Sequence, residues 1–392
     1  MKKWLSNMKK ETYVKAVIVA LGILIFGWVL HYANTDLPGQ MRHMPRMDFE
    51  RARVLAIIED QTVVDEAFEA VRRGNMVIEL ELLTGTYAGQ IGQVSYHVSP
   101  LFQVTATEGD VLSVRVGRVT NTSFDVLVHN HERTLLLVGL VVVFFLALSL
   151  IGGKKGFQAV LSLAFTLVSI VFLLIPLLVR GYNAITVTIG ILAVVTVISL
   201  LLIGGFTKKS AVAIIGCMSG VVFAAMLATF SGHVAGISGF NMEEAEALLS
   251  ISMDTELQIS GLFISGILIA SLGAVMDISM TIASAAEEIV TANRKITSKE
   301  LFKSSMNVGR DAMGTMSNTL ILAFIGTGLN MIIMIFAYGV TFNQFINTDL
   351  IAIEIIRSLS GSLGIVLTVP IVAYVASKMM MTESGTIKKR KK

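Results

Sequence analysis

The sequence predicts a polytopic α-helical membrane protein of about eight transmembrane helices, with a small β-rich extracytoplasmic domain between the first and second helices. Three observations carry this prediction. Hydrophobic residues make up 54% of the chain and charged residues only 15%, which is unlike the composition of a soluble protein. Several apolar runs reach the ~20 residues that a helix needs to cross a bilayer. The segment 34–133 instead alternates polar and apolar residues, as strands do.

The apolar runs combine Gly, Ser or Thr with aliphatic residues, a mixture that suits helix packing in lipid. They are Tyr13–Tyr32, Leu135–Ile151, Ala159–Val179, Ile185–Ile203, Ala211–Phe230, Gly261–Ala285, Ala312–Tyr338 and Leu359–Ala376. The first run follows lysines, but it is long for a signal peptide and no small-residue cleavage site follows it. We therefore expect an N-terminal anchor helix over 1–33, a seven-helix membrane domain over 134–380 and a basic cytoplasmic tail over 381–392.

Positive charge predicts the orientation of these helices. Counting through eight spans places every basic cluster on one side, which should be the cytoplasm. The clusters are the N-terminal lysines, Lys154 with Lys155, Lys208 with Lys209, the Arg294–Arg310 loop, and Lys388–Lys392. We expect a multi-pass protein of the cell membrane with both termini cytoplasmic and the β-rich domain outside. The net charge of +3 then reflects topology and contact with anionic lipid, not nucleic acid. Expected partners are the bilayer and either a paralogous membrane subunit or a second copy.

The segment 34–133 has the pattern of a small β-barrel of the OB or SH3-like kind. Asn34–Met47 is predicted to be a linker and Glu66–Arg73 a short helix. The predicted strands are Arg53–Ile58, Met76–Leu83, Val94–His97, Phe102–Ala106, Val111–Val116 and Phe124–Val128. Such barrels often bind oligomers in a groove, but a structural cap or an assembly module is an equal reading, because fold alone does not establish a ligand.

Candidates for metal or enzyme chemistry are weak. His129 and His131 are two residues apart, so in a strand they would point the same way and could ligate a metal. Met41, His43, Met44 and Met47 have side chains that could hold copper. Neither cluster includes an acid or a thiol, so loop residues are the simpler interpretation and no cofactor is expected.

No hydrolase or nucleotide-binding motif is present. Gly236-Ile237-Ser238-Gly239 matches the GxSG of rhomboid-type proteases, which need a histidine on a later helix as general base. The last histidine of this chain is His233, so a flexible outer turn is the better interpretation and an enzyme is not expected. The single cysteine, Cys217, lies in a predicted membrane helix as a packing residue.

The acid Asp277 lies within the apolar run Gly261–Ala285. A charged carboxylate near a bilayer centre costs roughly 2.5–3.5 kcal/mol. Helical spacing puts small and polar residues on the same face as Asp277: Gly266, Ala270, Gly273, Thr281, Ser284 and Glu288. Such a face marks a packed interface, a hydrated path, or both. The alternative is an acid that only locks two helices together.

The next helix repeats this pattern, with Asn307, Asp311, Gly314 and Asn318 on one face. A charged loop, Glu287–Asp311, precedes it, and Thr297-Ser298-Lys299-Glu300 could cap a short helix there. At about 1.5 Å per residue, Asp277 and the Ser317-Asn318 pair should lie at similar depth. An antiparallel hairpin would bring them face to face, as in a proton or cation relay. The predicted relay residues are Asp277, Thr281, Ser284, Asp311, Ser317, Asn318 and Thr319, and the predicted packing residues are Gly266, Gly273, Gly314, Gly326, Gly361 and Gly364.

Two of these segments carry a family resemblance. The runs Gly273–Ile289 and Asn307–Ala323 resemble the YibE/F-like family of multispanning bacterial membrane proteins, a likeness that extends over most of the chain. More distantly, the hairpin resembles SecD/SecF and RND transporter helices, in which an acid-bearing helix faces a hydroxyl-rich one. Arginine is absent from Ser317-Asn318-Thr319, so an Asp–Arg relay pair is not reproduced. The YibE/F-like family has no settled biochemical function to carry over, but the polar stripe that includes Asp277 favours an ion- or proton-coupled transporter or export-assisting permease. The alternative is a non-transporting scaffold, receptor or accessory factor that binds through its β-domain.

Overall fold

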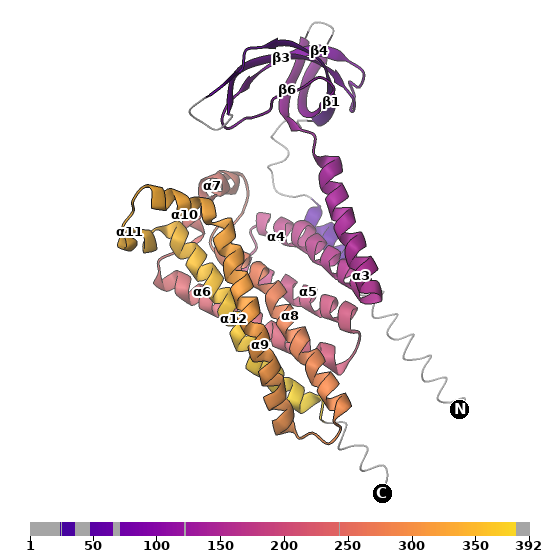
Figure 1. Cartoon of the computed structure of the whole chain (residues 1–392), viewed down its shortest axis with the longest axis vertical. Helices are drawn as coiled ribbons and strands as arrows, with labels where there is room; N and C mark the ends of the chain where they lie inside the picture. The colour runs from indigo at the N-terminus through magenta and orange to yellow at the C-terminus, as the bar shows by residue number, and fades with distance from the viewer. Residues whose placement is uncertain are drawn as a thin grey trace, which may run out of the picture. The chain divides into compact units, whose positions relative to one another are not determined.

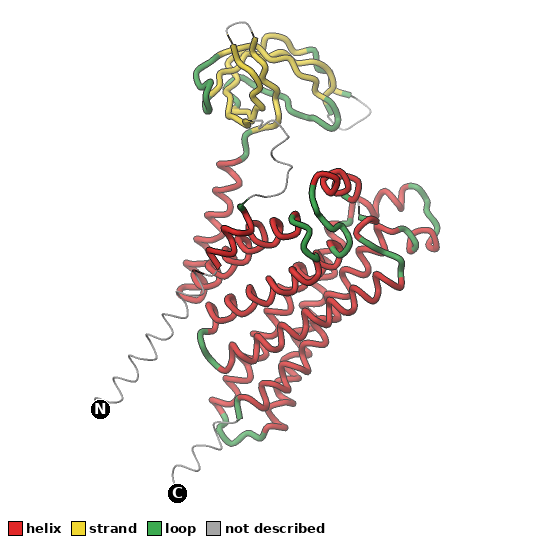
Figure 2. The backbone as a smooth tube through the Cα atoms, turned by 180° about the vertical axis from the view of Figure 1, so that it is seen from behind, coloured by secondary structure: helices red, strands yellow, loops and turns green. Residues whose placement is uncertain are grey.

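The computed structural model describes residues 24, 26–35, 48–65, 71–120, 123–242 and 244–381. Its chain forms two compact units (Figures 1 and 2). One consists of Gln40–Ala147, and the other combines Met1–Gly39 with Leu148–Lys392. The N-terminal lysines, most of the first apolar run, the cluster from Met41 to Met47 and the predicted basic tail lie outside the described residues.

The smaller unit contains an antiparallel sheet in the strand order β2-β3-β1-β5-β6, with β4 paired to β3. The strands are β1 (Asp48–Asp60), β2 (Val63–Val64), β3 (Arg72–Leu82), β4 (Ile91–Val98), β5 (Val111–Thr120) and β6 (Ser123–His131). Burial alternates along β3, where Met76, Ile78, Leu80 and Leu82 are buried, because successive side chains of a strand point to opposite faces. One face of the sheet therefore covers a hydrophobic core.

The sheet curls into a half-barrel (Figure 1). Register shifts within β1 and between β5 and β6 mark bulges, which bend strands and increase their twist. The curl brings the ring of Phe124 on β6 against Gly92 on β4, where any Cβ would collide with the ring. Glycine at this position thus permits the close approach of two strands that do not pair within the sheet.

Two predictions for this unit were wrong. Phe102–Ala106 forms no strand and contributes only an isolated bridge between Ser99 and Phe102. The segment alternates as a strand would because Val104 and Ala106 are buried in the core, but it has no partner ladder. The helix predicted over Glu66–Arg73 is also wrong at its end, since Arg72 and Arg73 begin β3; residues 66–70 lie outside the described part of the chain.

The larger unit is helical, with several long apolar helices and shorter helical segments between them; the first of the helices below begins within the residues of the smaller unit and continues into this one. The elements are α3 (Thr134–Ser169), η1 (Ile170–Leu174), α4 (Ile175–Val179), α5 (Ala184–Gly204), α6 (Lys208–Val234), η2 (Gly239–Asn241), α7 (Ala245–Asp254), α8 (Leu262–Ala292), α9 (Ser298–Thr327), α10 (Leu329–Ala337), α11 (Phe342–Ile346) and α12 (Asp349–Met379). Among the described residues, 5 helices are long and apolar enough to cross a membrane, or up to 6 if the bent pair α9 and α10 is one span.

The first of these candidates, Thr134–Val179, is interrupted at Gly153. This residue has φ 55° and ψ −135°, values that side chains other than glycine rarely adopt. The interruption separates 134–152 from 154–179, where the sequence predicts two spans joined near Lys154 and Lys155. The expected total of eight spans is not reproduced by the helix count, because the first run lies mostly outside the described residues.

Helices α6, α8, α9 and α12 lie side by side and form the centre of this unit (Figure 1). α6 crosses α12 closely: a Cβ added at Gly364 would lie 3.1 Å from the carbonyl oxygen of Gly220 and 3.0 Å from the Cβ of Ala224. Small residues permit such backbone approach in membrane helices. α9 packs on both α12 and α8 at Gly309, where a Cβ would meet Val369 and Ile282.

The connection between α8 and α9 is much shorter than the predicted charged loop. α8 continues to Ala292 and α9 begins at Ser298. Thr297 caps α9 by accepting a hydrogen bond from the Glu300 backbone N–H, and the Glu300 side chain accepts one from the Thr297 N–H. The predicted capping motif is therefore confirmed, but it starts one long helix that includes Arg310 and Asp311.

The described part of the N-terminal helix packs against η1 and α4. The Asn34 side-chain amide donates to the carbonyl oxygen of Phe172 within η1, at 2.7 Å, and the Arg180 guanidinium donates to the carbonyl oxygens of Tyr32 and Ala33. The widened turn of a π-helix commonly occurs at positions with a structural or functional role. These contacts hold the described part of the N-terminal helix against η1 and the end of α4.

Candidate functional site

Asp277 is the central residue of α8 and lies on its exposed face. The predicted small and polar stripe follows the same face: Gly266, Ala270, Gly273, Thr281 and Glu288 are exposed, and Ser284 is partly buried. The opposite side of α8 contacts α6 and α12 through buried residues such as Val275, Ile278 and Ile282. In a single chain, the stripe is therefore part of the exposed surface and is not packed against another helix.

The predicted partners of Asp277 do not reach it. Among the described residues, no hydrogen bond joins the Asp277 carboxyl to Thr281, Ser317 or Asn318, and no salt bridge includes it. The Ser317 hydroxyl is buried without a hydrogen-bond partner, and the Thr319 hydroxyl donates to the Thr315 carbonyl oxygen of its own helix, at 2.9 Å. The sequence predicts a relay that acts directly or through water, and among the described residues no direct hydrogen bond of that relay is formed in this arrangement of the helices.

The reason is the rotation of α9. Its Gly309 side packs on α12 and α8, so residues half a turn away point outward. Asn307, Asp311, Gly314 and Asn318 are accordingly exposed. The polar residues of both helices are therefore exposed, and no hydrogen bond among the described residues joins the Asp277 carboxyl to the polar face of α9.

The predicted packing glycines divide into two groups. A Cβ added at Gly266, Gly273, Gly314 or Gly326 would meet no atom within 4 Å, so packing at these four positions was predicted wrongly for a single chain. Gly361 and Gly364 of α12 do lie in close contacts, with Leu320 and with α6 respectively. The sequence analysis missed Gly216 and Gly220, where a Cβ would collide with Val372 and Thr368. Their spacing of four residues on α6 was the available signal.

A cavity of about 480 Å³ adjoins the break between α9 and α10, where the helix direction changes by 58°. The lining residues come from the segment before α7, from both sides of the break and from α12. They are Met242, Glu244, Thr327, Gly328, Asn330, Met331, Met334, Leu350, Ile353, Glu354 and Arg357. A second, almost wholly apolar cavity of about 390 Å³ shares Gly328, Met331 and Glu354 with the first. Glu354 thus lines a polar and an apolar space.

Glu354 and Arg357 form an ion pair within α12, with 2.7 Å between Oε1 of Glu354 and Nη1 of Arg357. Their side chains are 26% and 27% exposed, and the Arg357 guanidinium also lies over the Phe324 ring, 6.0 Å from its centroid. The second carboxylate oxygen of Glu354 and Nε of Arg357 are buried without a hydrogen-bond partner among the described residues. Buried polar atoms normally have a partner, so this pair retains unused bonding capacity.

Sequence reasoning missed this pair because it started the last span at Leu359, which left Glu354 and Arg357 outside the span. α12 in fact begins at Asp349. The signal was present: Glu354 and Arg357 are three residues apart among Ile351, Ile353 and Ile355, a spacing that pairs opposite charges on one helix face.

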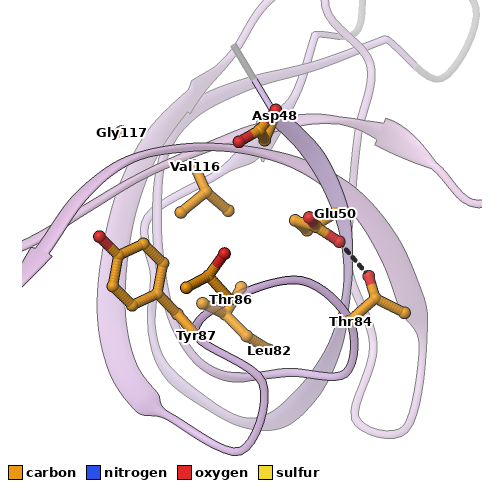
Figure 3. Close-up of a pocket in the computed structure, with 8 residues that line it drawn as sticks. All are labelled: Asp48, Glu50, Leu82, Thr84, Thr86, Tyr87, Val116 and Gly117. Atoms are coloured by element: carbon orange, nitrogen blue, oxygen red, sulfur yellow. Dashed lines mark hydrogen bonds between the residues drawn. The ribbon is translucent and has the colours of Figure 1, made fainter. Parts of the chain in front are cut away.

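The pocket described in the β-unit is much smaller than the two cavities of the helical unit. This pocket, of about 30 Å³, lies between β1, β5 and the loop after β3 (Figure 3). The Thr84 hydroxyl donates to the Glu50 carboxylate at its edge. A space of this size holds little more than one water molecule, so the pocket is not a binding groove for an oligomer.

The remaining residues singled out in the sequence, His129 and the turn with Ser238, make ordinary packing and capping contacts. The His129 ring packs edge-on against Phe49, with centroids 4.9 Å apart. The part of the chain that the structure describes contains no group of three or more His, Cys, Asp or Glu side chains able to hold a metal. Ser238 caps η2, and its hydroxyl donates to the Asn241 side chain at 3.1 Å.

A family model described as YibE/F-like protein matches residues 140–382, which include all of α5 to α12 and both runs that resemble this family. No curated protein and no solved structure matches the chain, so the likeness to SecD/SecF and RND helices stays a prediction. The matched region spans more than half of the chain and includes the cavity, the Glu354–Arg357 pair and Asp277. The chain belongs to the YibE/F-like family.

Proposed function

We propose that this protein is a membrane permease, coupled to protons or another cation, and not an enzyme. The observation that carries the proposal is the break between α9 and α10 beside a cavity with a paired Glu354 and Arg357. Interrupted helices bind solutes in many transporters, because irregular backbone at membrane depth is tolerated only where it lines a cavity or is buried in protein. Charged residues inside spans typically pair with each other and mark such pathways.

Asp277 is the coupling residue in this proposal. It lies midway along an apolar helix, and no described residue forms an ion pair with it. A permanently charged carboxylate at that depth is costly, so its surroundings favour exchange of a proton or a bound cation. Loading and unloading of Asp277 would bias the packing of α8 against its neighbours.

The topology in the proposal has eight spans, both termini in the cytoplasm and the β-unit outside. The break at Gly153 supports counting two spans in Thr134–Val179, and the helical residues 26–34 support one more before the β-unit. Lys154, Lys208 and Arg294 then share one side with both termini. Labelling of single cysteines in intact cells tests the map: a cysteine at Gly89 should react with an impermeant reagent, and one at Lys299 should not. Labelling only at Lys299 would reverse it.

Flux in proteoliposomes tests the proposed activity. Vesicles holding a pH-sensitive dye would contain the full chain, and a pH gradient would be imposed in the presence of a mixture of small amines, carboxylates and polyols. We expect the wild type to dissipate the gradient faster than protein-free vesicles, Asp277→Asn to lose this effect, and Glu288→Gln to keep it. Glu288 is the matched control because it lies on the same exposed face near the end of α8. Wild-type flux in Asp277→Asn would remove the coupling role, and no flux in the wild type would remove the permease.

The second candidate is a non-transporting scaffold or accessory factor that binds another membrane subunit. The exposed stripe of α8 favours it, since a Cβ added at Gly266 or Gly273 would meet no atom within 4 Å and a charged Asp277 facing lipid would be costly. A protein that shows no flux but copurifies with one membrane partner, in a complex broken by Gly273→Leu, would support this candidate.

A further inference from the structure

The two cavities at the α9–α10 break form a divided space with Glu354 at their boundary. The 480 Å³ cavity carries the polar groups, whereas the 390 Å³ cavity is lined by apolar side chains such as Ile321, Phe324 and Phe345 apart from Glu354 and Ser358. Each lies within the roughly 300–1,000 Å³ of small-molecule sites. A ligand that extends across Gly328 and Met331, which both cavities share, would present a polar end to one and an apolar end to the other.

The charges of the lining favour a cation. Among the described lining residues, Glu244 and Glu354 carry two negative charges and Arg357 one positive charge. Arg357 already contacts Glu354 and the Phe324 ring. An anionic solute would have to compete with Glu354 for the guanidinium and would add to the negative excess. A protonated amine would instead neutralise the excess and donate to the Glu354 carboxylate, whose second oxygen has no hydrogen-bond partner among the described residues.

We propose that this divided cavity binds a small organic cation, a protonated amine on a short apolar chain, with Glu354 as its anionic contact and Arg357 as the residue that positions Glu354. The inference rests on the proposed permease function and names its class of solute. The amine would occupy the polar cavity near Glu354, and the apolar chain would extend past Met331 into the second cavity.

Binding without a membrane gradient tests the inference separately from transport. The full chain in detergent would be titrated with n-hexylamine, 1-hexanol and hexanoate, three six-carbon probes that differ in their polar end, and with methylammonium, which lacks the chain. The readout is the shift in the temperature of unfolding, which reports binding to the folded state. We expect hexylamine to raise this temperature more than the other three probes.

Substitutions of Glu354 and Arg357 test whether the rise in unfolding temperature is caused by binding in this cavity. In Glu354→Gln the apparent affinity for hexylamine should fall by about tenfold or more, as expected when a hydrogen bond to a charged group is lost. Because that variant leaves Arg357 without its partner, the double variant Glu354→Gln with Arg357→Met provides a folded, uncharged version that should also lose the shift. Glu246→Gln, an exposed acid of α7 outside the cavity lining, should keep it.

Three results would overturn the inference: an equal or larger shift with hexanoate, no shift with hexylamine in the wild type, or a full hexylamine shift in the folded double variant. Flux without hexylamine binding would leave a permease with a different solute. Hexylamine binding without flux would leave a receptor for amines and remove the permease.

Discussion

Two carboxylates in apolar helices of this protein have opposite surroundings. Glu354 of α12 is mostly buried and paired with Arg357, whereas Asp277 of α8 is exposed in the single chain and has no ion-pair partner among the described residues. Glu354 shows how a charge is accommodated inside the fold, by an opposite charge one helical turn away. Asp277 shows a charge that the fold of one chain does not compensate. Both acids have apolar neighbours in the sequence, so those neighbours do not distinguish them. The difference is that Glu354 has an oppositely charged partner in the fold, whereas Asp277 has none among the described residues and can change its protonation or cation occupancy without breaking an ion pair.

The largest effect should come from breaking the pair. Arg357→Met leaves the carboxylate of Glu354 without its counter-ion, and removing one partner of a buried pair costs about 3–5 kcal/mol. Because both side chains are about one quarter exposed, we expect about 3 kcal/mol, measured by thermal unfolding in detergent. The double variant with Glu354→Gln should recover most of the loss. A single variant as stable as the wild type would mean that the pair does not hold α12.

The second prediction compares the stability effects of replacing a glycine on the exposed face near Asp277 and a glycine in a close helix contact. Gly273 precedes Asp277 by one turn, and a Cβ added there would meet no atom within 4 Å, whereas a Cβ at Gly220 would collide with Thr368. Gly220→Ala should therefore destabilise the protein by about 1–3 kcal/mol through overpacking. Gly273→Ala should be neutral or gain up to about 1 kcal/mol from helix propensity. Both are read from unfolding curves, and an equal loss in the two variants would show that the α8 face is covered.

Asp277 itself should contribute little to stability. Its carboxyl accepts no hydrogen bond from a described side chain, so Asp277→Asn should change the free energy of unfolding by no more than about 0.5 kcal/mol. Glu354→Gln is the comparison, since it leaves Arg357 unpaired. A destabilised Asp277→Asn would assign Asp277 the role of locking two helices, which the sequence left open.

The smallest effect concerns a carboxylate in water, Asp60 of the β-unit. Hydrogen bonds from the Thr62 hydroxyl and backbone N–H, with the nearby Arg72, lower the pKa of Asp60 below its ordinary value. A lowered pKa in the folded state contributes stability above the unfolded pKa, and this contribution is lost as pH falls through the folded pKa. We therefore expect the hydrogen-exchange protection of β1 and β3 to decline below about pH 4. In Asp60→Asn this decline should be weaker, and an identical decline would exclude Asp60 as its source.

The sequence was most informative where one periodicity dominates. The long apolar runs predicted α5 to within one residue at each end and identified α6 and α8, although α8 continues to Ala292, beyond the predicted end at Ala285. Alternation of polar and apolar residues identified β3 and β4. Prediction failed at 102–106, because burial alternates there in a segment that has no partner strand. It also failed for α12, whose first turns combine Asp349, Glu354 and Arg357 with isoleucines, so that hydropathy alone placed them outside a span.

For the candidate site, the sequence could identify a polar face but not what lies opposite it. Helical spacing correctly grouped Asp277 with Gly273 and Thr281 on one face of α8. The rotation of α9 depends on its contact with α12 at Gly309 and Val369, residues that are distant in the chain. A hairpin considered as two helices contains no information about the third helix that orients it.

The crossing of α6 and α12 has a consequence for the forces that hold this fold together. The Cβ position of Gly220 would lie 3.3 Å from the carbonyl oxygen of Gly364, and that of Gly364 3.1 Å from the carbonyl oxygen of Gly220. In glycine, a hydrogen on Cα points in that direction, so the two residues direct C–H groups at each other's carbonyl oxygen. Such Cα–H···O contacts contribute about 0.5–1 kcal/mol each. Their strength depends on the distance between the two backbones and not on the hydrophobic effect. The hydrophobic effect does not drive helices together in lipid, because no water separates them there.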